Sequence, residues 1–256
     1  ESINQVTVKN LTQVYEAKYV PEKMQFVACG DFSDNQVQTI LRQVGKLQQK
    51  YLHGKGKSTA EKQVSFRMLH DQVLPARGNS NSFGLGIRFK NFKKVLLSFD
   101  LTQILLEIML ESKLSAMGPW FEEMRKKQLL MDSLQISVNY TRQGDFATIF
   151  GVSPQAQEVI AEIKRVLTEP IKKNSAEYRF IRQNFILQKK EWLARTARTS
   201  NDLSYLAIEL IEENLDHENL TQNIAKLQAM NFDQFYDYCQ KIMKDSELCS
   251  AYLENK

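Results

Sequence analysis

Histidine and cysteine are the residues of this chain best suited to hold a metal ion or attack a substrate, and both are sparse. The three histidines, His53, His70 and His217, lie far apart, and none has a second histidine within one helical turn. A zinc site needs three or four ligands that converge on one ion. The dispersed histidines therefore predict no metal site within this chain.

The cysteines do not indicate nucleophilic or disulfide chemistry. Cys29, Cys239 and Cys249 are too few and too scattered for a disulfide framework or a zinc knuckle. Each lies in an apolar stretch, where burial disfavours the reactive thiolate. The chain also lacks a G-x-S-x-G motif and a phosphate-binding loop. We expect no catalytic residue here, and a reducing, cytoplasmic location.

Composition bounds the class of protein. The chain has 256 residues, of which 43% are hydrophobic and 25% charged, enough for a folded core. The net charge of +4 is mild, so a nucleic-acid partner is not expected. No apolar run reaches the roughly 18 residues that a membrane span requires, so no membrane partner is expected either. The chain begins with Glu1, which is not an initiator, so we expect the natural N-terminus to lie upstream.

Helices and strands are mixed along the chain. Apolar residues at helical spacing predict helices at residues 3–19, 33–49, 101–114, 119–128, 154–167, 175–199 and 201–214. Apolar or alternating runs predict strands at residues 24–29, 64–69, 82–89, 94–99, 133–140 and 145–152. A polar, glycine-bearing stretch at 53–59 is the best linker candidate. The pattern predicts an α+β fold with a mixed, largely antiparallel sheet covered by helices.

The two ends of the chain echo each other at a distance of 221 residues. The apolar residues that align are Val6, Leu11, Val14 and Tyr15 with Leu227, Phe232, Phe235 and Tyr236. Each copy reads as an amphipathic helix followed by a short apolar run, at 24–29 and 248–253. A unit that recurs at domain-sized spacing indicates tandem copies of one domain.

Two segments resemble a known peptidase family. Residues 14–32 read VYEAKYVPEKMQFVACGDF, a helix ending in tyrosine, then proline, methionine and an apolar strand that ends in Gly-Asp. An apolar helix, a serine-containing loop and the segment WFEEMRKKQLL at 120–130 follow in order. These features are similar to the pitrilysin/insulinase-like zinc peptidases, which include the mitochondrial processing peptidase. The resemblance is strongest to bacterial two-domain members.

The resemblance implies one catalytic and one non-catalytic domain. Residues 1–60 would be the helix-strand-helix tail of a first peptidase-like domain, and residues 63–256 a complete second, non-catalytic domain. The family's H-x-x-E-H zinc motif would lie upstream, so this chain alone is expected to be inactive and to need no cofactor. Zinc is implied for the parent protein, a zinc metalloendopeptidase of the inverzincin type. The implied partners are the N-terminal catalytic domain and a peptide substrate, with a homodimer or heterodimer as a further possibility.

Two residues are candidates for substrate binding through this resemblance. The family commonly offers an arginine in the second domain and a tyrosine seven residues later; here Arg125 matches the arginine, but Asp132 stands in place of the tyrosine. A guanidinium still suits a peptide carbonyl or carboxylate, and Asp132 could instead pair with it. The strand at 133–140 could also add a peptide by edge pairing, unless a neighbour covers that edge.

Two alternatives remain open at this point. The chain could be a structural or assembly subunit that kept the fold without supporting cleavage, or, as the weakest alternative, a nucleic-acid-binding module. Because the strand at 24–29 would lack its own sheet, residues 1–60 are expected to be mobile or paired with another chain. Packing of this strand into the sheet of the second domain would contradict that expectation.

Overall fold

The chain separates into two compact units. The computed structural model describes residues 3–21, 24–51, 70–75, 81–90, 97–141, 144–216, 219–244 and 246–254. One unit comprises Glu1–Lys62 with Ala197–His217, and the other comprises Gln63–Thr196 with Glu218–Lys256. The predicted boundary between a tail at 1–60 and a domain at 63–256 stays a prediction.

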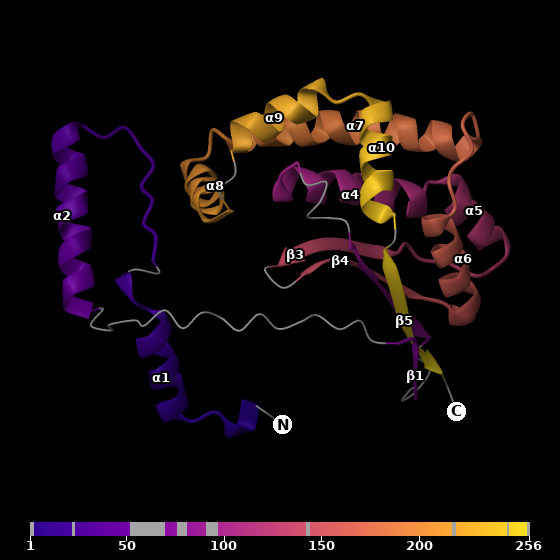
Figure 1. The fold of residues 1–256 in the computed structure, drawn as a ribbon, viewed down its shortest axis with the longest axis horizontal. Helices are drawn as coiled ribbons and strands as arrows, with labels where there is room; N and C mark the ends of the chain where they lie inside the picture. Colours follow the sequence, from indigo (N-terminus) through magenta and orange to yellow (C-terminus); the bar gives the residue numbers. More distant parts are fainter. Residues whose placement is uncertain are drawn as a thin grey trace. The chain divides into compact units, whose positions relative to one another are not determined.

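The larger unit is built on a five-stranded sheet (Figure 1). The strands lie in the order β1 (Gln72–Pro75), β5 (Glu247–Glu254), β2 (Ser82–Arg88), β4 (Gly144–Val152) and β3 (Gln135–Thr141). Only the β1–β5 pair is parallel, and the other pairs are antiparallel. The predicted α+β class with a mixed, largely antiparallel sheet is confirmed.

Alternation along β2 decides which face of the sheet is covered. Phe83, Leu85 and Ile87 are buried, whereas Gly84 and Gly86 point to the opposite face. The buried face packs against α4 (Phe99–Leu114), α5 (Pro119–Lys126), α6 (Ala156–Thr168) and α10 (Phe232–Met243). This apolar interface is the main core of the unit.

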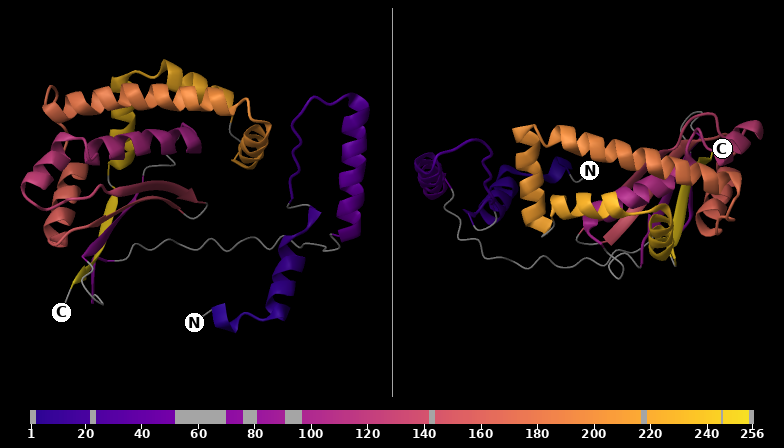
Figure 2. Two further views of the ribbon diagram at one scale, coloured as in Figure 1. Left: turned by 180° about the vertical axis from the view of Figure 1, so that it is seen from behind. Right: turned by 90° about the horizontal axis from the view of Figure 1, so that it is seen from above.

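A second core lies on the far side of α4. Leu101, Leu105 and Met109 pack against α7 (Ala176–Thr199), α9 (Leu220–Ala229) and α10. The rings of Phe185 and Phe235 stack there with centroids 4.3 Å apart. Helix α4 therefore lies between the sheet and the outer helices (Figures 1 and 2), which explains why it is apolar on almost every side.

The smaller unit contains α1 (Val8–Lys18), α2 (Asp34–Tyr51) and α8 (Leu203–Asp216), with the short 3-10 helix η1 (Ile3–Gln5) before α1. Neither α1 nor α2 buries a side chain. The prediction of a strand at 24–29 is wrong, because these residues pair in no ladder. An apolar run becomes a strand only where a neighbouring strand accepts its hydrogen bonds.

Two other elements differ from the sequence prediction. Phe99, the last residue of the strand predicted at 94–99, instead begins α4, because Ser98 caps this helix and its hydroxyl accepts from Leu101 N at 3.2 Å. Strand β1 was not predicted. It is anchored by Asp71, whose carboxylate accepts from Ser250 N and Lys164 Nζ, both at 2.7 Å. The strand predicted at 64–69 and the linker at 53–59 lie outside the described residues.

None of the described helices is both long and apolar enough to cross a lipid bilayer.

Candidate functional site

Arg125 lies in the last turn of α5 and is exposed. The helix ends there because Gln128 adopts a left-handed conformation with φ 57°. Leu129 N then donates to Met124 O at 2.9 Å and Gln128 N donates to Arg125 O at 3.0 Å, which closes the helix end. The backbone of Arg125 is therefore fixed while its side chain faces solvent.

Asp132 lies in the loop between α5 and β3 and is also exposed. The loop is anchored to the core, because Leu129 and Leu130 are buried and the Ser153 hydroxyl donates to Leu129 O at 2.6 Å. Three residues after Asp132, at Gln135, the chain enters β3. Arg125 and Asp132 thus lie in the chain segment that leads into this strand, which we call the approach to β3.

The two candidate residues do not form an ion pair with each other. The neighbours of Arg125 are paired along the helix, Lys126 with Glu122 at 2.8 Å and Lys127 with Glu123 at 2.6 Å. Among the described residues, no carboxylate lies within ion-pair distance of the Arg125 guanidinium. Its donors are available to an external acceptor.

Strand β3 forms one edge of the sheet. It pairs with β4 on one side, and no strand of the described chain pairs with its outer side. Val138 is buried under the helices, whereas Gln135 and Ser137 are exposed on the other face. The strand carries no charged residue and no proline, the usual devices that prevent edge pairing. An extended peptide could therefore add to this edge by main-chain hydrogen bonds.

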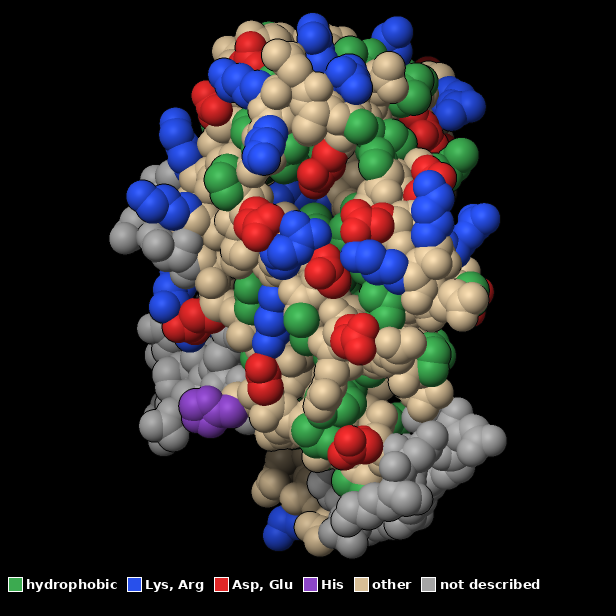
Figure 3. All heavy atoms as spheres, turned by 90° about the vertical axis from the view of Figure 1, so that its right-hand side faces the viewer, with side chains coloured by type: hydrophobic (Ala, Val, Ile, Leu, Met, Phe, Trp, Pro, Cys, Tyr) green, Lys and Arg blue, Asp and Glu red, His purple; other side chains and the backbone are tan. Residues whose placement is uncertain are grey.

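Several charged side chains of the larger unit form ion pairs. Arg165 pairs with Glu162 at 2.8 Å and Glu169 at 2.9 Å. Lys90 pairs with Glu247 at 2.5 Å. Basic and acidic side chains alternate on the face shown in Figure 3. This face therefore lacks the basic stripe that typically follows a nucleic-acid backbone.

The histidines contribute no described metal site. His70 is exposed just before β1, and His53 and His217 lie outside the described residues. In the described part of the chain, no three histidine, cysteine, aspartate or glutamate side chains are grouped so that they could hold a metal ion.

Lys113 is a buried cation that the sequence interpretation missed. Its ammonium donates to Val166 O at 2.8 Å, near the end of α6. Burial, only partly offset by the Glu177 carboxylate, lowers the pKa of Lys113 to about 8. The spacing from Leu106 and Leu110 places Lys113 on the buried stripe of α4, and this was the available signal. Its role is to hold α6 against α4.

Comparison with known proteins identifies the family. The model of the peptidase M16 inactive domain matches residues 5–185. The chain belongs to the peptidase M16 inactive-domain family. The resemblance to the pitrilysin/insulinase-like peptidases, and to their C-terminal, non-catalytic part, is thereby confirmed. Comparison with curated protein sequences gives no match.

Solved structures share the fold at low sequence identity. The peptidase M16 inactive domain from Pseudomonas fluorescens matches with TM-score 0.64 and 14% identity, covering 100% of this chain and 60% of that chain. A protease from Helicobacter pylori gives TM-score 0.60, 16% identity and coverage of 98% and 60%. A predicted insulinase family protease from Yersinia pestis gives TM-score 0.59, 15% identity and coverage of 98% and 56%. This chain therefore spans about three-fifths of the length of these longer proteins.

Proposed function

We propose that this M16 inactive domain is the substrate-positioning part of a zinc-dependent peptidase, and that it holds an extended peptide along the outer edge of β3. The observation that carries the proposal is the edge itself. It is seven residues long, unpaired within the described chain and free of charge and proline. Such an edge offers a peptide a row of main-chain donors and acceptors.

Arg125 supports the proposal because it lies at the approach to this edge with its guanidinium uncommitted. Its planar fork of donors suits a peptide carbonyl or a C-terminal carboxylate. Asp132, on the same approach, would accept from a main-chain N–H or a basic side chain of the peptide. The two residues would fix the direction in which a peptide enters.

The chemistry of cleavage would come from a partner domain. We propose that an N-terminal domain of the same protein supplies zinc through an H-x-x-E-H helix, together with the glutamate that activates water. This chain would contribute binding energy and orientation of the peptide. Peptides and the N-terminal domain are therefore the proposed partners.

The test is peptide cleavage by the full-length parent, with and without a chelator, beside this chain alone. We expect chelator-sensitive cleavage by the parent and none by the chain. Arg125→Ala in the parent should raise KM roughly threefold to tenfold with little change in kcat, because it removes a binding contact. Lys126→Ala, which removes a neighbouring cation on the same helix, is the matched control. Equal effects of both variants would contradict a specific role for Arg125.

Edge pairing is tested from the side of the peptide. An extended peptide should protect the amides of β3 from hydrogen exchange, and its analogue with N-methyl groups at alternate residues should not, because it lacks the donors. Equal protection by both peptides would exclude strand addition.

A structural or assembly subunit is the second candidate. Apolar residues of α1 and α2, including Leu11, Val14, Leu41 and Leu47, are exposed, which suits a surface that another domain or chain covers. Absence of both cleavage and bound zinc in the purified parent would favour this alternative.

A further inference from the structure

The hydrogen bonds between β2 and β4 show which main-chain groups of β4 face β2. Phe89 N donates to Asp145 O at 3.1 Å, and Ser153 N donates to Asn81 O at 3.0 Å. Main-chain groups alternate in direction along a strand, so the odd-numbered residues of β4 direct their N–H and C=O groups toward β2. The pairing of β2 with β4 is continuous and contains no bulge, so this alternation holds along the whole of β4.

The same alternation assigns the main-chain groups at the outer edge of β3. Even-numbered residues of β4 face β3, and Thr148 lies opposite Ser137. The main-chain groups of Ser137 and, two residues later, Asn139 therefore pair with β4. Those of Ile136 and Val138 point the other way, toward the outer edge. Among the described residues, none outside β3 and β4 makes a main-chain hydrogen bond to Ile136 or Val138.

An added strand would be antiparallel to β3. Antiparallel ladders are slightly more stable per residue, and every pair of this sheet except β1–β5 is antiparallel. In such a ladder, two residues that exchange both hydrogen bonds lie directly opposite each other, with their side chains on the same face. A peptide residue bonded to Ile136 or Val138 would therefore direct its side chain to the face that the helices cover. The peptide residues between would direct their side chains to the uncovered face and their N–H groups to solvent.

The two faces of β3 differ in the side chains that they present. On the covered face, Val138 is 2% exposed and Ile136 packs against the main core. Helix α4 lies over β3 on this face (Figure 1). On the uncovered face, Gln135 and Ser137 are exposed and polar. Apolar side chains form favourable cross-strand pairs with Ile136 and Val138, whereas a charged side chain beside them would lose hydration.

We propose that the edge of β3 selects extended, antiparallel peptides with an apolar residue at every second position, and that these apolar residues exchange main-chain hydrogen bonds with Ile136 and Val138. Polar residues alternate with them and lie beside Ser137. Proline is excluded from the apolar positions, because it has no N–H to donate. This inference rests on the proposed function, since it names the class of peptide that the same edge binds.

The first experiment tests the assignment of the edge groups in the full chain without peptide. Hydrogen exchange followed by ¹H–¹⁵N NMR should be fast at the amides of Ile136 and Val138. It should be slow at the amides of Ser137 and Asn139, because only these are bonded to β4. Slow exchange at Ile136 and Val138 in the free chain would overturn the proposal.

The second experiment compares two N-methylated forms of the peptide acetyl-Thr-Val-Thr-Val-Thr-Val-amide. One form carries its methyl groups on the three threonines, and the other carries them on the three valines. A methylated residue cannot donate, so each form can pair with the edge only through its other residues. The threonine-methylated form should protect the amides of Ile136 and Val138 and bind roughly threefold to tenfold more tightly, because it places valine side chains on the covered face.

The results distinguish this inference from the proposed function. Equal affinity of the two forms, with protection of Ile136 and Val138 by both, would leave peptide binding at the edge intact and overturn the preference for apolar residues. Tighter binding of the valine-methylated form would place valine side chains on the uncovered face and would also overturn it. If neither form nor the unmethylated peptide protects these amides, the proposed function fails together with the inference.

A variant of the chain tests the residue that selects the side chain. Ile136→Thr keeps the β-branched shape and makes the covered face polar at this position, so it should reduce the ratio of the two affinities. Ser137→Thr, a change on the uncovered face, is the matched control and should leave the ratio unchanged. An equal ratio in a folded Ile136→Thr variant would contradict selection by Ile136. If that variant does not fold, the comparison of the two methylated forms on the wild type still decides the proposal.

Discussion

Helices α1 and α10 carry related amphipathic patterns but differ in burial. Both begin with a reciprocal capping box, Thr7 with Asn10 in α1 and Asn231 with Gln234 in α10. Helix α10 buries Phe232, Phe235, Cys239 and Ile242, whereas α1 buries no residue at all. An apolar stripe therefore specifies that a helix has a face to bury, but not which part of the chain will cover it.

The segments that follow the two helices differ in the same way. After α10 the chain enters β5, which pairs with both β1 and β2. After α1 the chain passes through residues 24–29 without joining a ladder. The tail thus has the pattern of a domain end without the sheet that would complete it. This agrees with our proposal that a preceding domain supplies the partner surface.

The largest expected effect comes from truncating matched positions of the two helices. Phe235 is fully buried, and its aligned counterpart Val14 is 57% exposed. Phe235→Ala should lower the free energy of unfolding by about 3–5 kcal/mol, through lost burial and a cavity beside Phe185. Val14→Ala should change it by less than about 0.5 kcal/mol.

The measurement is denaturant unfolding followed by far-UV circular dichroism, which reports on helices throughout the chain. A loss of stability in Val14→Ala close to that in Phe235→Ala would show that Val14 is buried in solution and would remove the contrast between the helices.

Burial also distinguishes lysines of the two regions. Lys113 is enclosed in the core of the larger unit, and Lys9 of α1 is exposed. Because burial lowers the pKa of Lys113 from 10.5 to about 8, the folded protein releases this proton at lower pH than the unfolded chain. The unfolded state therefore binds more protons between pH 8 and pH 10.5, and the contribution of Lys113 to stability rises over that range by roughly 3 kcal/mol.

The measurement is denaturant unfolding of the wild type and of Lys113→Met at several pH values. The difference between their free energies of unfolding separates the contribution of Lys113 from that of the other titrating groups. The stability of the wild type relative to the variant should rise as pH increases from 8 to 10.5. Lys9→Met controls for the loss of one lysine. A constant difference between wild type and Lys113→Met would mean that the ammonium reaches solvent.

The sequence predicted most of the elements of the larger unit, because their signals are local. The alternation of Phe83, Leu85 and Ile87 identified β2, and the hairpin at 133–152 was placed within one or two residues. Local signals failed where the secondary structure of a segment depends on a neighbouring strand or on a helix cap. Residues 24–29 have the composition of a strand but no neighbour, and Phe99 has strand propensity but follows the Ser98 cap.

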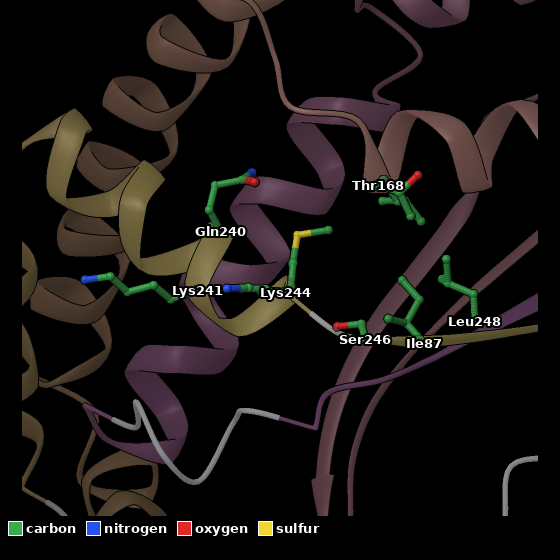
Figure 4. Close-up of a pocket in the computed structure, with 9 residues that line it drawn as sticks. Ile87, Thr168, Gln240, Lys241, Lys244, Ser246 and Leu248 are labelled. Carbon is green, nitrogen blue, oxygen red and sulfur yellow. The ribbon is translucent and has the colours of Figure 1, made fainter.

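The candidate functional residues also differ in whether a local sequence signal identifies them. The resemblance located Arg125 and Asp132, and their role in binding substrate stays a prediction. No local signal marks the cavity of about 540 Å³ that Ile87, Leu167 and Leu248 help to line (Figure 4), because these residues come from β2, α6 and β5, which are far apart in the chain. Lys113 had a signal in its helical spacing, but a lysine on an apolar stripe is ordinarily read as a boundary residue.

The smallest expected effect concerns the two capping boxes. Asn231→Ala removes the oxygen that accepts from Gln234 N at 2.9 Å, and it should cost about 1 kcal/mol because α10 is integral to both cores. Thr7→Ala removes the equivalent acceptor for Asn10 N at 3.2 Å, but α1 has no packed face whose stability depends on it. The fluorescence of Trp120 and Trp192, both in the larger unit, should therefore report a lower unfolding midpoint for Asn231→Ala alone. If Thr7→Ala lowered that midpoint equally, the two capping boxes would be energetically equivalent, and α1 would contribute to the stability of the larger unit.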